Sequence, residues 1–167
     1  MPSWQDRSVW VPALAYLGLM PFAACIVADQ VFQAPLASQI FQVYGLAIAT
    51  FLLGSWWGIA LTRTTLGGMP WFEIGLSNAL LILAVMIFLM PTVWGLLAQG
   101  GLFVVLLAVE RWRLVFRSAP SYYQRMRRRV TVLVAMLHAL MAALQMSTPG
   151  KVIPTCWCRH RPSWPGR

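Results

Sequence analysis

Three uncharged polar side chains inside long apolar stretches are the residues best placed to do chemistry: Asn78, Gln99 and His138. At the helical rise of ~1.5 Å per residue, all three would lie ~10–16 Å from the same end of their helices. Histidine changes charge near neutral pH, so such a cluster could bind a small solute or relay protons. Hydrogen bonding between helices is the favoured interpretation, because no carboxylate lies near the centre of an apolar stretch.

Composition indicates that these stretches are dissolved in lipid. The chain has 167 residues, of which 59% are hydrophobic and 10% are charged. A soluble domain has about a quarter of its residues charged, which is enough polar surface to face water. This chain has too little, and we therefore expect an integral membrane protein.

The apolar residues fall into five stretches near the length of ~20 residues that crosses a bilayer as a helix. Pro91 divides a block that is too long for one span. We expect an all-α bundle of five transmembrane helices in residues 1–148. We expect residues 149–167, a basic tail rich in proline and tryptophan with two cysteines, to be disordered. The predicted spans are about 8–28, 39–62, 71–90, 92–109 and 130–146.

Arginines in the connecting segments predict the orientation, because cytoplasmic loops carry an excess of basic residues. A cytoplasmic N-terminus places Arg7, Arg63 and the seven arginines of 111–129 inside, and Lys151 and the three later arginines outside. We expect a bacterial inner membrane, because the polar N-terminal segment is too short for a transit peptide. The mitochondrial inner membrane is the alternative.

The second predicted span carries a stripe of small residues, Thr50, Gly54 and Gly58, with the spacing that lets helix backbones approach closely. We therefore predict that another helix packs there. Trp56 and Trp57 would point away from this stripe and lie near the cytoplasmic headgroups. Tryptophan is enriched at that level because its ring stays in lipid while its N–H reaches water. A ligand-binding vestibule lined by these indoles is the alternative interpretation.

The 111–129 segment is the most basic part of the chain, and it ends in Arg125, Arg127, Arg128 and Arg129. Ser121 and Gln124 form a capping box, which predicts that the last helix starts near Tyr122. We expect these arginines to contact anionic lipid headgroups, with an acidic partner protein as the alternative. The formal net charge of +9 is concentrated beside apolar spans, which argues against a nucleic-acid partner.

Three motifs also resemble a known family. The sequences "YGLAIATFLLGSWWGIAL" at 44–61, "LAYLGLMPF" at 14–22 and "SYYQRMRRRVT" at 121–131 are similar, in order and spacing, to the domain-of-unknown-function 3429 family. That family includes mitochondrial transmembrane protein 69 and bacterial relatives. Leu53 and Trp56 depart from the family pattern, which has glycine and histidine there. The resemblance implies a small multi-span membrane protein, and it implies no biochemical activity.

The sequence contains no set of residues that indicates catalysis, such as a nucleophile with its base or a carboxylate pair. No cofactor and no metal site are predicted, since one Cys-x-Cys and one histidine in the tail supply too few ligands. We therefore expect a non-catalytic accessory, scaffold or assembly component, with a membrane protein partner or a second copy of itself. A carrier or channel for protons or small solutes is the alternative.

Overall fold

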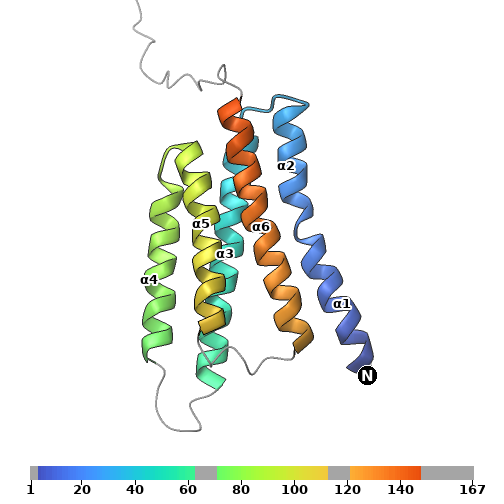
Figure 1. Cartoon of the computed structure of the whole chain (residues 1–167), viewed down its shortest axis with the longest axis vertical. Coiled ribbons are helices and arrows are strands. Elements are labelled where there is room, and N and C mark those ends of the chain that lie inside the picture. The colour runs from blue at the N-terminus through green and yellow to red at the C-terminus, as the bar shows by residue number, and fades with distance from the viewer. Residues whose placement is uncertain (1–3, 63–70, 113–120, 148–167) are drawn as a thin grey trace, which may run out of the picture.

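The computed structural model describes residues 4–62, 71–112 and 121–147, and these segments are helical with short connections (Figure 1). The predicted disordered tail at 149–167 lies outside the described residues. The helices are α1 (Trp4–Leu17), α2 (Met20–Gln30), α3 (Ala37–Thr62), α4 (Trp71–Phe88), α5 (Thr92–Trp112) and α6 (Ser121–Ser147).

Five stretches of these helices are long and apolar enough to cross a membrane, which confirms the expected all-α class. The helices run up and down in turn, as Figure 1 shows. Large apolar side chains cover the outside of the bundle as well as its core; Ile82 and Met136, for example, are more than 60% exposed. A bundle with an apolar exterior is stable in lipid rather than in water. The five candidate spans are Pro12–Gln30, Ala37–Leu61, Trp71–Phe88, Thr92–Trp112 and Tyr123–Ser147.

The first span differs from the prediction of one unbroken helix over 8–28, because α1 and α2 are separated at Gly18 and Leu19. Pro21, in the first turn of α2, has no N–H with which to continue the ladder to Leu17. The break leaves backbone groups to satisfy, and the Tyr44 hydroxyl of α3 donates to the Gly18 carbonyl at 2.9 Å. α1 consequently diverges from the axis of α2 (Figure 1).

Close helix packing inside the chain uses glycines other than the two predicted ones. A Cβ at Gly45 of α3 would lie 2.6 Å from the His138 ring, and one at Gly95 of α5 would lie 2.6 Å from the Gln42 amide. By contrast, Gly54 and Gly58 are exposed, and a Cβ at either would meet nothing within 4 Å. The predicted stripe therefore lies on the outer face of α3.

A polar contact also closes the bundle at the end where α2 finishes. Asp29 is 3% exposed and accepts hydrogen bonds from Gln30 at 2.7 Å and from Gln145 of α6 at 3.0 Å. It thus links α2 to α6, the two helices that lie side by side there in Figure 1.

Candidate functional site

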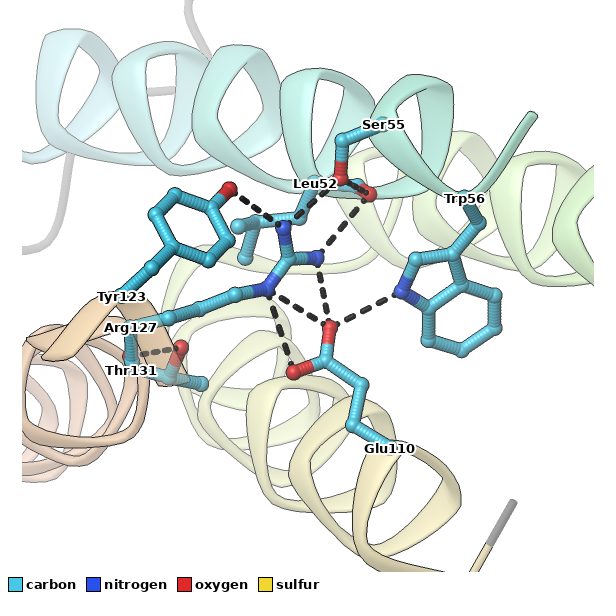
Figure 2. A network of polar contacts seen from close by, with 7 residues as sticks. All are labelled: Leu52, Ser55, Trp56, Glu110, Tyr123, Arg127 and Thr131. Carbon is cyan, nitrogen blue, oxygen red and sulfur yellow. Dashed lines mark hydrogen bonds and ion pairs between the residues drawn. The ribbon is translucent and has the colours of Figure 1, made fainter. Parts of the chain in front are cut away.

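The most extensive polar cluster in the described residues is centred on Arg127, two turns into α6 (Figure 2). We predicted that this arginine lies at the lipid headgroups with its neighbours. That placement is wrong for Arg127, which is 8% exposed and points into the bundle. Arg125, Arg128 and Arg129 are exposed, as headgroup contact requires.

Glu110, near the end of α5, is the counter-charge of Arg127. Arg127 Nε donates to the Glu110 carboxylate at 2.9 Å to Oε1 and 3.1 Å to Oε2, and Nη2 donates to Oε1 at 2.5 Å. The Glu110 side chain is only 13% exposed. The two charges thus neutralise one another away from water, in the geometry that a guanidinium and a carboxylate favour.

The remaining N–H groups of the guanidinium are satisfied by α3 and by α6 itself. Nη1 donates to Ser55 Oγ at 2.7 Å and to the Tyr123 hydroxyl at 3.3 Å, and Nη2 donates to the Leu52 carbonyl at 3.2 Å. A guanidinium has five N–H donors, and all five have an acceptor here. Arg127 thus joins α3, α5 and α6 at one point (Figure 2).

Trp56 completes the cluster from α3. Its indole Nε1 donates to Glu110 Oε1 at 2.8 Å, and the side chain is 1% exposed. The prediction that Trp56 is an interfacial anchor is therefore wrong, because its N–H donates to the Glu110 carboxylate inside the bundle and not to water. Trp57 is 39% exposed and lies in the last two turns of α3. At the same end of the bundle, α4 begins with the exposed Trp71 and α5 ends with the exposed Trp112. Tryptophan is enriched at membrane surfaces in this way.

The second polar site lies in the middle of the bundle, where the predicted Gln99 and His138 converge on Gly45. Gln99 Nε2 donates to the Gln42 carbonyl at 3.1 Å, and a Cβ at Gly45 would lie 2.6 Å from His138 Nε2 and 3.0 Å from Gln99 Nε2. The third predicted member, Asn78, is not there: it is exposed and donates to the Ile74 carbonyl of its own helix at 3.0 Å. Gln42 contributes only its backbone carbonyl to this site, because its side-chain amide donates to the Thr92 carbonyl at the start of α5 at 2.9 Å.

Two acceptor atoms at this site have no hydrogen-bond partner among the described residues: His138 Nε2 and Gln99 Oε1. His138 Nδ1 donates to the Val134 carbonyl at 2.8 Å, so in the neutral ring Nε2 carries no hydrogen. The rings of Phe41, Phe103 and Phe22 surround the imidazole at centroid distances of 4.9, 5.3 and 5.4 Å. A buried polar atom without a partner needs an explanation, and a proton or a small hydrogen-bond donor would satisfy an acceptor such as His138 Nε2.

Within the helices that the structure describes, no three histidine, cysteine or acidic side chains gather as metal ligands would. The two cysteines and the histidine of the tail lie outside the described residues. The sequence analysis also missed Glu110 as the partner of Arg127. The signal for this pair was the cost of an unpaired charge in a membrane, which favours pairing of opposite charges.

The fold and the polar clusters together define a small polytopic helical membrane protein. An internal ion pair between Arg127 and Glu110 joins three of its helices. A family model described as "Protein of unknown function (DUF3429)" matches residues 9–143, and the chain belongs to that family. No curated protein and no solved structure matches the chain. The resemblance to mitochondrial transmembrane protein 69 in particular stays a prediction.

Proposed function

We propose that the protein is a non-catalytic component of a larger membrane assembly, and that it binds a partner helix through the outer face of α3. The observation that carries this is the position of Gly54, which is exposed on α3 beside Thr50 and Gly58. The partner is a transmembrane helix of another protein or of a second copy.

Glycine needs a reason in the middle of a helix, where it lowers stability by about 1 kcal/mol relative to alanine. At Gly45 the reason is internal, since the His138 ring occupies the space of a side chain. At Gly54 the space is open, so packing among the helices that the structure describes does not require glycine. In lipid, small residues spaced by four allow a second backbone to approach, and such contacts drive helix association.

Replacement of both stripe glycines by leucine tests the proposal. The Gly54→Leu/Gly58→Leu variant should fold normally, because the added side chains meet open space, yet it should lose its partner during purification in a mild detergent. Gly101→Leu on α5 is the matched control, since Gly101 is also exposed with nothing within 4 Å of its Cβ. Equal recovery of the partner with all three proteins, or no partner in any of them, would contradict the proposal.

A proton or small-solute carrier is the second candidate, and the unpartnered His138 Nε2 and Gln99 Oε1 favour it. The purified protein in liposomes should then dissipate a pH gradient. His138→Gln should abolish that flux, and Asn78→Ala, outside the site, should leave it unchanged. Flux no greater than that of empty liposomes would remove this candidate.

We further propose that the N-terminus is cytoplasmic, in a bacterial inner membrane. The exposed Arg111, Arg128 and Arg129 support this, since they lie at the end of the bundle where α1 begins.

A further inference from the structure

A pocket of about 370 Å³ lies between α1, α3 and α6, and Thr50, Gly54 and Gly58 of the proposed partner face are not among its lining residues. Its walls are apolar side chains, among them Leu14 of α1, Ile48 and Phe51 of α3, and Val130 and Val134 of α6. This volume falls in the range of sites that bind small molecules, about 300–1,000 Å³.

The pocket opens toward the outside of the bundle. Leu14 and Phe51, from the two helices at its edge, are 64% and 70% exposed. The break at Gly18 accounts for the space, because α1 leaves the direction of α2 there and diverges from the bundle (Figure 1). Since these helices lie in the spanning region, the opening faces lipid, and the occupant must come from the bilayer.

The Tyr123 hydroxyl, which lines the pocket, is a hydrogen-bond donor available to a bound molecule. Arg127 and Thr131 also line it, but the guanidinium donors are fully used and the Thr131 hydroxyl donates to the Arg127 carbonyl at 2.9 Å. Tyr123 accepts from Arg127 Nη1, while its own O–H has no acceptor in the described part of the chain. That hydroxyl can donate to an oxygen of a molecule in the pocket.

The charge of the exposed side chains near the pocket indicates which lipid headgroup is favoured. Arg111, Arg128 and Arg129 are exposed at the end of the bundle where Tyr123 lies, whereas Glu110 is paired internally. Each basic group near the surface contributes about a few-fold preference for anionic lipid. We propose that this pocket binds one anionic phospholipid: an acyl chain lies against the apolar walls, the Tyr123 hydroxyl donates to an ester carbonyl, and the exposed arginines at this end of the bundle favour a negatively charged headgroup.

Native mass spectrometry of the delipidated protein, titrated with phosphatidylglycerol or phosphatidylcholine, tests this site. One phosphatidylglycerol should bind in preference to phosphatidylcholine. Val130→Trp fills the pocket and should abolish that binding, while Val132→Trp, on an exposed part of the same helix, should retain it. Equal binding by the two variants, equal binding of the two lipids, or occupation of the site by a second copy of the chain would overturn the proposal.

Tyr123→Phe tests the hydrogen bond itself. Loss of one neutral hydrogen bond should weaken phosphatidylglycerol binding about fivefold. Ser55→Ala is the matched control, because it removes the other Nη1 acceptor of Arg127 without touching the pocket. Binding by Ser55→Ala should equal that of the unchanged protein. An equal loss in both variants would assign the effect to the Arg127 cluster and contradict a direct role of Tyr123.

Discussion

Arg127 carries a charge into the region where three helices meet, and its pairing with Glu110 joins them. Removing one member of a buried ion pair leaves the other charge without compensation, which lowers stability by about 3–5 kcal/mol. Lysine is a poor substitute, since its ammonium has three donors and no planar fork. The sequence held a signal for this role: Arg125, Arg128 and Arg129 share one helical face, and Arg127 lies on another.

Arg127→Ala should therefore lower the free energy of unfolding by about 3–5 kcal/mol in detergent micelles, because the Glu110 carboxylate loses its counter-charge. The measurement is unfolding followed by helical circular dichroism. Arg128→Ala is the control and should change stability by less than about 0.5 kcal/mol, as an exposed substitution does. Similar losses in the two variants would show that the ion pair does not hold the bundle.

The glycines give a second residue-scale prediction, in which one change has opposite effects at two positions of α3. Gly45→Ala places a Cβ 2.6 Å from His138 Nε2 and should destabilise the protein by about 1–3 kcal/mol. Gly54→Ala meets open space and should stabilise the isolated protein by up to about 1 kcal/mol. Thermal unfolding of the two variants in the same detergent checks both. A stabilising Gly45→Ala would be inconsistent with the close approach of α3 and α6.

At the level of elements, apolar length and Pro91 were enough to predict helices close to α3, α4 and α5, because hydrophobic thickness fixes the length of a span. The break between α1 and α2 was missed, although Pro21 was a visible signal. Side-chain placement within a helix was harder. All faces of these helices are apolar, so periodicity does not reveal that Trp56 points inward and that Gly54 points outward.

Pro21→Ala should convert α1 and α2 into a more continuous helix, because the new N–H can donate to the Leu17 carbonyl. Spin labels at Leu14 and Met136, which are both exposed, report the separation of α1 from α6 by pulsed electron paramagnetic resonance. We expect the distance distribution to shift in Pro21→Ala. The same labels with Pro35→Ala, in the connection after α2, are the control. An unchanged distribution in Pro21→Ala would mean that Pro21 does not set the break.

At the scale of the whole molecule, five candidate spans place the start of α1 and the end of α6 on opposite sides of the membrane. Reporter fusions after residues 34, 90 and 116 in a bacterial host check this. We expect the first two outside and the third in the cytoplasm, because the arginine-rich connection stays inside. A fusion after residue 116 that is active only outside the cytoplasm would reverse the proposed orientation.

The account of function depends on the outer face of α3, and a photo-crosslinking amino acid at position 54 in native membranes tests it most directly. We expect one dominant crosslinked protein at position 54, either a partner or a second copy, and none at position 101 on α5. Crosslinks to lipid alone at position 54, or the same pattern at both positions, would contradict the proposal that this face binds another helix.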